Sequence, residues 1–358
     1  MTLQSPDAGG LDENRMKESV LEHLRAERSV PSLSFAEDPV RLMGGFDTLV
    51  YAFRLAGAPT DLAGPLVLRV FPGSGGVGQA SKEAIFQNAV ASSGFPVPRV
   101  IVAGGERTID GRAFNIMERI PGHSLMEDMF ADPEAGPRVA DQLAQTLADL
   151  HAMPSSGVEE SLRNAGFPMH QANLSSGLRY IQRYVAESAM AHLAPATEWL
   201  TQNQPSERDT LSVCHGDFHP GNVMADGGQI TGVLDWPGAL LADPEYDVAI
   251  TLTLIAVAGP ALADNVPAEV FEAFANGYLE AYSRRRTVDP ERLQYYRAYR
   301  AIRAFVRATA ARTPGVDPDL MPRDQYPWAE EGAARRLAGV IKDTTGLDVP
   351  LPPGVEPA

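Results

Sequence analysis

The chain has 358 residues, of which 44% are hydrophobic and 21% are charged. A chain of this length and composition can build a large core and more than one domain, which argues against wholly disordered, collagen-like and coiled-coil classes. Its single cysteine, Cys214, excludes an internal disulfide and a zinc site made of several thiolates. No basic stretch leads into an apolar signal segment near the start, so we expect a cytoplasmic protein.

The formal net charge of −16 is concentrated in the later part of the chain. Residues 1–120 carry 14 acidic and 12 basic side chains, whereas residues 121–358 carry 32 and 18. Such a field opposes nucleic-acid phosphates and anionic membranes and can attract a cationic small molecule. We therefore expect no nucleic-acid partner, no membrane partner, a small-molecule partner that a positive charge would favour, and a monomer or homodimer.

Two different periods follow one another in the first third of the chain. Residues 13–28 space apolar side chains at helical intervals and predict an amphipathic helix, a leader within residues 1–34. Residues 35–120 are then predicted to form a small antiparallel sheet with one helix. The expected elements are strands over 40–43, 49–55 and 65–71, a helix over 81–92, and strands over 99–104 and 113–120.

Beyond Gly122 the pattern is mainly helical, and residues 121–345 are predicted to form a larger helical part. Apolar side chains recur at three- and four-residue spacing over 139–153, 178–193, 270–286 and 291–311. The longest apolar run, 248–263, is shorter than the ~20 residues of a membrane-spanning helix, so we expect a buried helix there.

Strand character interrupts the helical part at one place. Residues 223–225 and 230–235 are predicted to pair as a hairpin because Asp226-Gly227-Gly228 joins them. The proline-rich residues 346–358 show no period and predict a loose tail.

Polar side chains able to handle a proton or a metal gather around this hairpin. Asp217 and Asn222 lie five residues apart just before the first strand, and Asp235 follows the second. Because the hairpin folds back on itself, we expect Asp235 to return beside Asn222. Phosphoryl transfer needs a carboxylate that orients an attacking hydroxyl, and an amide and a second carboxylate that hold magnesium. Asp and Asn also form turns, which is the structural alternative for each residue alone.

The motifs around these residues resemble those of the aminoglycoside phosphotransferase (APH) family of small-molecule kinases. They are His-Gly-Asp-x-His-Pro-Gly-Asn over 215–222, Leu-Asp-Trp over 234–236 and Asp-Pro-x-x-Asp-Val-Ala over 243–249. The resemblance implies an α+β, two-lobed protein-kinase-like fold. It also implies that the protein moves the γ-phosphoryl group of ATP or GTP to a hydroxyl of a small molecule, with Mg²⁺ as cofactor. Asp217 would be the catalytic carboxylate, and Asn222 and Asp235 the metal ligands.

The same resemblance assigns nucleotide-binding residues in the first part of the chain. Gly44 and Gly45 would belong to a loop that covers the nucleotide with its backbone amides. Arg69 stands in the third strand where kinases place a lysine, and Glu83 resembles the acid that pairs with this cation. The segment that would hold the adenine through its backbone, at the hinge over 117–122, contains Met117, Glu118 and Ile120.

Other polar residues near the motifs have a structural and a functional interpretation. The resemblance makes His215 a support of the catalytic loop, and Asp247 is predicted to cap a helix or anchor this loop. His219 is a candidate for the substrate side. We expect Cys214 to be a buried small residue and His151 to be structural.

A rival motif lies in the glycine tract 73–78. Gly73, Gly75 and Gly78 satisfy Gly-x-Gly-x-x-Gly between a strand and a helix, which is the arrangement of an NAD(P) site. The antiparallel character of the neighbouring strands argues against it, and the absence of Lys-Ser/Thr after Gly78 excludes a P-loop. We expect a loop beside the nucleotide instead.

Two questions stay open at this level. The arginine in place of lysine at position 69 leaves a non-catalytic, nucleotide-binding pseudokinase module as an alternative. The acceptor also stays open, because aminoglycoside-like, macrolide-like, choline-like and metabolite-like acceptors all fit the pattern.

Overall fold

The computed structural model describes residues 12–42, 48–71, 76–104, 108–109, 111–187, 190–263, 266–316 and 330–356. These residues form two compact units. The sheet unit contains the described residues up to His123, together with Gly157–Phe167 and Met224–Pro237. The helical unit contains Ser124–Ser156, Pro168–Val223 and the described residues from Gly238 onward.

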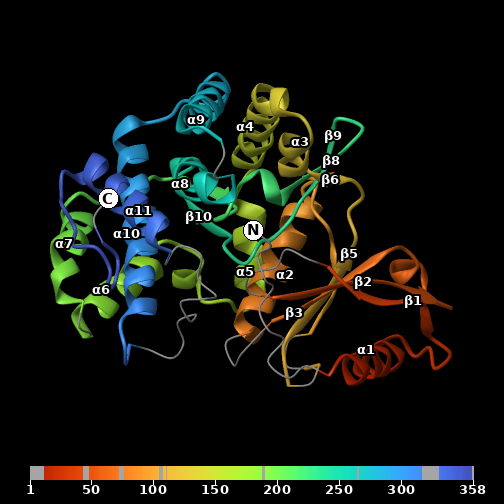
Figure 1. Ribbon diagram of the computed structural model, residues 1–358. Coiled ribbons are helices and arrows are strands. Elements are labelled where there is room, and N and C mark those ends of the chain that lie inside the picture. The colour runs from red at the N-terminus through yellow and green to blue at the C-terminus, as the bar shows by residue number, and fades with distance from the viewer. Residues whose placement is uncertain are drawn as a thin grey trace. The chain divides into compact units, whose positions relative to one another are not determined.

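Five strands of the sheet unit form an antiparallel sheet in the order β1-β2-β3-β5-β4 (Figure 1). They are β1 (Ser34–Arg41), β2 (Leu49–Ala56), β3 (Leu66–Val70), β4 (Val100–Ala103) and β5 (Phe114–Glu118). The predicted strands lie where the sequence places them, except that β1 begins at Ser34 instead of Val40. As an edge strand, β1 is mostly exposed and contains Pro39, so it lacks the alternation that marks a half-buried strand.

Helix α1 (Glu13–Arg28) is part of the core of the sheet unit and not a separate leader. Its N-terminus is capped by Asp12, whose carboxylate accepts hydrogen bonds from two backbone amides. Met16, Val20 and Leu24 are fully buried and belong to the same apolar cluster as the side chains of β2, β3 and β5. The amphipathic period of this helix therefore covers the sheet.

Helix α2 (Gly76–Ser92) begins earlier than predicted, so Gly76 and Gly78 are helical and do not belong to a loop. Gly73 and Gly75 lie outside the described residues. The strand before this helix, β3, pairs antiparallel with both of its neighbours, β2 and β5. A dinucleotide site needs a parallel strand–helix–strand unit, so the rival motif lacks its structural context.

The hairpin β8 (Val223–Asp226) and β9 (Gln229–Val233) forms a three-stranded sheet with β6 (His123–Ser124) in the order β6-β8-β9. Residues 224–237, which the sequence analysis places in the helical part, group with the sheet unit. The reason is a set of hydrogen bonds to that unit, from Thr231 Oγ1 to the Pro121 carbonyl at 2.8 Å and from the Val233 amide to the Pro96 carbonyl at 2.9 Å. Gly122, at φ +100°, allows the close approach because a Cβ there would meet the Ala225 carbonyl.

The helical unit is built around a core formed largely by the buried helix α8 and the long helix α10. Its main elements are α3 (Leu125–Ala131), α4 (Gly136–Ala152), α6 (Ser175–Glu187), α7 (Ala194–Gln202), α8 (Glu245–Leu262), α9 (Ala268–Ser283), α10 (Pro290–Arg312) and α11 (Glu331–Thr345), with strands β7 (Ser212–Cys214) and β10 (Leu240–Ala242). The helix α5 (Ser156–Asn164) lies mostly in the sheet unit. In the described part of the chain, no helix is both long and apolar enough to cross a membrane.

The predicted loose tail is partly held in place. The Arg335 Nε donates to the carbonyl of Glu356 at 2.7 Å, and an Arg312 nitrogen donates to the carbonyl of Pro353 at 3.3 Å. Val355 is 7% exposed. A proline-rich segment has no period of its own, but its carbonyl groups still accept hydrogen bonds from arginine side chains on neighbouring helices.

Candidate active site

In the sheet unit, Arg69 joins two acidic side chains that come from different elements. Its Nη1 lies 3.2 Å from an oxygen of Glu83 on α2, and its Nη2 lies 2.6 Å from Oδ1 of Asp235, just after β9. The Arg69 side chain is 10% exposed and that of Glu83 is 1% exposed, whereas the Asp235 side chain is 39% exposed. The planar guanidinium can bind both carboxylates at once. Arg69 is thus held between two acids, the buried Glu83 and the more exposed Asp235.

The backbone of Asp235 has an unusual conformation. Its φ is +69°, and among the described residues only Ser29 shares a positive φ without being glycine. The neighbouring Trp236 is fully buried, and its indole Nε1 donates to the carbonyl of Val233 at 2.8 Å. Left-handed residues other than glycine cluster at functional sites, where the surroundings enforce them. Here the anchored Trp236 follows directly after the turn that orients the Asp235 carboxylate.

Burial raises the pKa of Glu83 to about 7, although the nearby Arg69 guanidinium lowers it. The charge of Asp235 raises it further, and a hydrogen bond from the backbone of Trp236 lowers it. The cost of removing a carboxylate from water thus outweighs the gain from pairing it with an arginine at this depth. Glu83 is therefore the buried member of this group whose charge changes near neutral pH.

A pH dependence of stability follows from this pKa. Because the folded-state pKa lies above the ordinary value of 4.5, the folded protein binds more protons than the unfolded chain between that value and about 7. The contribution of Glu83 to the free energy of unfolding is therefore present at low pH and is lost as the pH rises through this window, by roughly 1–3 kcal/mol. As the pH rises from about 5 to about 8, we expect the free energy of unfolding of Glu83→Gln to increase relative to that of the wild type.

Urea unfolding of both proteins at the two pH values measures this difference. Glu160→Gln, at an exposed position on α5 in the same unit, is the matched control and should keep the pH slope of the wild type. An equal slope in wild type and Glu83→Gln would contradict the assignment.

In the helical unit, the loop that follows β7 is held by the buried carboxylate of Asp247. Its Oδ2 accepts a hydrogen bond from the amide of His215 at 2.6 Å, and its Oδ1 accepts one from the amide of Gly216 at 2.8 Å. The ring of His151 lies 3.2 Å from the same carboxylate, and Thr251 donates to the carbonyl of Phe218 at 2.8 Å. A buried carboxylate that receives two backbone donors is well satisfied and fixes the direction of the chain.

Two further features bend the loop sharply. Gly216 has φ +82°, and a Cβ there would overlap the backbone of Gly238. The buried His215 ring accepts a hydrogen bond from the amide of Asp217 at 3.2 Å, and Asn222 Nδ2 donates to the carbonyl of Asp217 at 2.9 Å. The backbone of Asp217 is thus held from both sides, while its side chain stays 39% exposed.

Two basic side chains lie beside the carboxylate of Asp217. His219 Nε2 is 3.8 Å from Oδ2, and Arg300 Nη2, on α10, is 3.6 Å from Oδ1. His219 is predicted from the sequence, whereas Arg300, which is far from the loop in sequence, is not. The only sequence signal for it is the regular spacing of arginines along α10.

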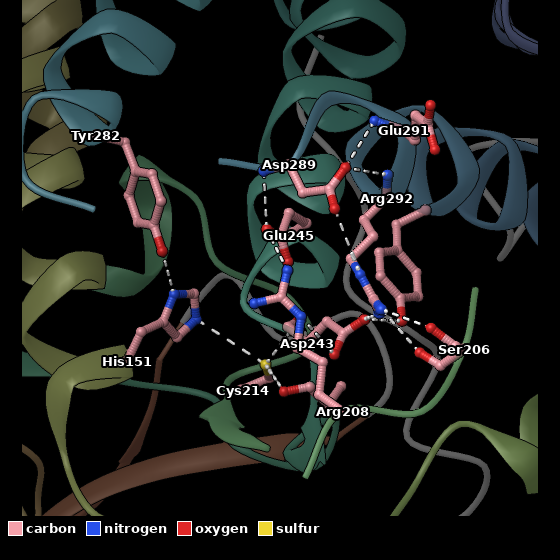
Figure 2. Close-up of polar contacts among 12 residues, drawn as sticks. His151, Ser206, Arg208, Cys214, Asp243, Glu245, Tyr282, Asp289, Glu291 and Arg292 are labelled. Carbon is pink, nitrogen blue, oxygen red and sulfur yellow. Dashed lines mark hydrogen bonds and ion pairs between the residues drawn. The ribbon is translucent and has the colours of Figure 1, made fainter. Parts of the chain in front are cut away.

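The Asp-Pro-x-x-Asp motif supplies the support behind the loop (Figure 2). Asp243 is bound by Arg292 and by the hydroxyl of Tyr296, the latter at 2.8 Å. Glu245 accepts hydrogen bonds from Arg208 at 2.9 Å and from the amide of Asp289 at 3.0 Å. These buried acids tie the start of α8 to the start of α10, so the first turn of α8 presents Asp247 to the loop.

In the same region, side-chain atoms of His151, Cys214 and Asp247 that are of metal-ligand type lie within 4.8 Å of one another. His151 also contacts the hydroxyl of Tyr282 at 2.6 Å, as Figure 2 shows. Burial, followed by the charges of Asp247 and Asp243, raises the pKa of the Cys214 thiol well above its ordinary value. His151 and Asp247 also make the contacts that hold the loop, so this cluster supports the loop.

The other predicted nucleotide residues are only partly described. Gly44 and Gly45 lie outside the described residues. Met117 is buried against Gln87, and the amide of Glu118 donates to the carbonyl of Arg99 at 3.0 Å. Ile120 lies against Gly232 of the hairpin. The structure thus shows where this segment lies, and its contact with adenine stays a prediction.

The donor chemistry of the two predicted metal residues fits magnesium. Mg²⁺ prefers oxygen ligands and is usually held by one or two protein side chains plus substrate phosphates. Asp235 has a carboxylate and Asn222 an amide oxygen, which are donors of this kind, and their joint binding of a metal stays a prediction. Asn222 directly precedes β8, and Asp235 lies two residues after the end of β9.

Comparison with known proteins identifies the family. A sequence model described as the phosphotransferase enzyme family, APH, matches residues 40–336. An aminoglycoside 3'-phosphotransferase of Streptomyces fradiae is 29% identical over 206 residues, which are 57% of this chain and 72% of that protein. The acyl-CoA dehydrogenase family member 11 of Gallus gallus is 29% identical over 178 residues, which are 48% of this chain and only 22% of that longer protein.

A solved structure shows the same fold. It is a thermostable mutant of the aminoglycoside phosphotransferase APH(4)-Ia in ternary complex with AMP-PNP and hygromycin B, with a TM-score of 0.61 and 20% identity. The match covers 92% of this chain and 99% of that chain. The predicted α+β, protein-kinase-like fold is therefore confirmed, and the chain belongs to the APH family of phosphotransferase enzymes.

Proposed function

We propose that the protein transfers the γ-phosphoryl group of ATP or GTP to a hydroxyl of a small molecule, with Mg²⁺. The observation that carries the proposal is the loop after β7, in which Asp247 and Asn222 hold the backbone while the Asp217 carboxylate stays accessible. Held in this way, a carboxylate can orient a hydroxyl and take its proton without reorganising during the reaction.

Each residue has a separate task in this proposal. Asp217 accepts the proton of the acceptor hydroxyl, and Arg69, oriented by Glu83, holds the phosphates. Asn222 and Asp235 would hold the metal, which would neutralise negative charge on the phosphates. The backbone of the segment with Gly44 and Gly45 covers the nucleotide, and the segment 117–120 contacts the base. His215 and Asp247 support the loop, and His219 lies on the acceptor side.

The relatives support the reaction class. An aminoglycoside 3'-phosphotransferase and a viomycin phosphotransferase of Streptomyces vinaceus are phosphotransferases by name, the latter 31% identical over 44% of this chain and 55% of that protein. The nucleotide analogue in the APH(4)-Ia complex supports a nucleoside triphosphate as donor. None of them identifies the acceptor of this chain.

One observation favours a second candidate, a non-catalytic nucleotide-binding module. Arg69 replaces the usual lysine, and its guanidinium lies 2.6 Å from Asp235, the carboxylate that the proposal assigns to the metal. An arginine that kept this contact would compete with magnesium for Asp235. Nucleotide binding without a phosphorylated product would support this candidate.

The test is transfer of the phosphoryl group to a broad panel of hydroxyl compounds, followed by mass spectrometry. With the wild type we expect a magnesium-dependent product that is heavier by one phosphoryl group. Asp235→Asn should lower kcat/KM by about 100-fold or more because the metal loses its charged ligand. Asp226→Asn, at the exposed hairpin turn, is the control and should match the wild type. Undiminished magnesium-dependent turnover in Asp235→Asn would refute the metal assignment.

A further inference from the structure

Helix α10 has an unusual charge for this acidic protein. It carries six arginines and one acidic residue, Glu291. The arginines are Arg292, Arg297, Arg300, Arg303, Arg307 and Arg312. Because the chain as a whole has a net charge of −16, this helix is a local region of the opposite sign.

Three of these arginines share one face of the helix. Arg300, Arg303 and Arg307 follow one another at three- and four-residue spacing, and all three are partly buried. Arg300 begins this row beside the catalytic loop, 3.6 Å from Asp217. The first arginine of this row, Arg300, therefore lies beside the proposed base, to which an acceptor would bring its hydroxyl.

The charges of the first two arginines reach a common pair of tyrosines. Burial raises the pKa of Tyr299, and the guanidinium groups of Arg303 and Arg300 lower it. The rings of Tyr246 and Tyr299 lie 6.2 Å apart between centroids. Arg300 and Arg303 therefore act on one region next to the loop and are not dispersed over the surface.

Arg300 is also incompletely satisfied. Its side chain is 17% exposed, and the distance of 3.6 Å to Asp217 is too long for a hydrogen bond. Within the part of the chain that the structure describes, its guanidinium makes no hydrogen bond and no other ion pair. A guanidinium offers five donors in a planar fork that fits a carboxylate or phosphate. An anionic group is thus the ligand that this position is suited to bind.

We propose that the acceptor carries an anionic group, a carboxylate or a phosphate, near the hydroxyl that it offers, and that Arg300 binds this group. The inference rests on the proposed function and reverses the expectation, drawn from net charge, of a cationic acceptor. The acceptor oxygen forms its bond to the γ-phosphorus as the bond to the departing nucleoside diphosphate breaks, and the hydroxyl proton passes to Asp217. An amine-bearing acceptor would instead bring a positive charge against Arg300.

Matched pairs of acceptors test this inference with magnesium and ATP. One arm uses hydroxyalkanoic acids against their primary amides, and a second uses sugar phosphates against the free sugars; kanamycin and hygromycin B serve as cationic acceptors. We expect the wild type to prefer an anionic member over its neutral partner by about 10- to 100-fold in kcat/KM. The arm that shows the preference identifies carboxylate or phosphate.

Variants separate anion binding from a positioning role. Arg300→Gln should raise KM for the anionic acceptor and remove most of the preference, while Arg300→Lys should keep part of it. If Arg300 only positions Asp217, kcat will fall equally for both members of a pair, and the proposal is wrong. Arg284→Gln, an exposed arginine at the end of α9, is the control for loss of charge and should behave as the wild type.

Failure of this inference is distinct from failure of the proposed function. Transfer to neutral or cationic acceptors with no anionic substrate would overturn the anionic acceptor but leave the phosphotransferase intact. The absence of transfer to every compound would count against both. Thermal stabilisation by magnesium and ATP without any product would then point to the nucleotide-binding module.

Discussion

Asp217→Asn is expected to lower kcat by about 10²- to 10⁴-fold while the protein stays folded and binds nucleotide. An asparagine has the same shape but cannot accept the proton of the acceptor hydroxyl. Its effect on stability should be small because the Asp217 side chain is 39% exposed and the hydrogen bonds that hold this residue involve its backbone. Steady-state kinetics with the best acceptor, together with the melting temperature in magnesium and ATP, measure both effects.

A matched variant makes this result specific. Asp149→Asn removes a carboxylate from the exposed face of α4, where it bonds Gln145 within the same helix, and should keep wild-type kcat. If Asp217→Asn retained a kcat within a few-fold of the wild type, proton acceptance at this position would be excluded, and the role of the loop would have to be sought elsewhere.

Asp247→Ala should have the largest effect on stability, about 3–5 kcal/mol in the free energy of unfolding. The variant leaves the buried amides of His215 and Gly216 without an acceptor and removes the carboxylate beside His151. The loop should also lose its fixed direction, so activity should fall even under conditions in which the protein is folded. Urea unfolding followed by circular dichroism measures the first effect, and turnover at low temperature measures the second.

An exposed ion pair provides the comparison. Asp141→Ala removes the partner of Arg285 at a position where the carboxylate is 51% exposed, and it should cost at most about 1 kcal/mol. Asp247→Asn keeps one acceptor oxygen and should fall between the two. A loss below 1 kcal/mol in Asp247→Ala would show that water or neighbouring groups can replace this carboxylate.

The elements that could be predicted from sequence are the amphipathic helix α1 and the apolar, mostly buried strands. Helix α1 is found over the predicted residues 13–28, the strands β3 and β5 lie within the predicted runs, and β2 extends one residue beyond its run. The edge strand β1 begins six residues before its predicted start because exposed strand residues carry no pattern. The start of α2 differs from the prediction because glycines favour loops in a sequence, whereas Gly76 lies so close to Phe71 that a Cβ there would overlap it.

The residues of the candidate site also fall into two groups, those that a local motif predicts and those that only tertiary contacts bring together. Asp217, Asn222 and His215 lie within eight residues, so their motif alone determined the bent loop and the chemistry that it predicts. Contacts between distant segments had no such signal. The anchoring of the loop by Asp247 was one of two roles predicted for that residue, but only the folded chain brings Arg69 against Asp235 and sets Arg300 beside Asp217. Local spacing specifies the conformation of a short segment, whereas the pairing of side chains on separate helices and strands depends on how their buried faces pack.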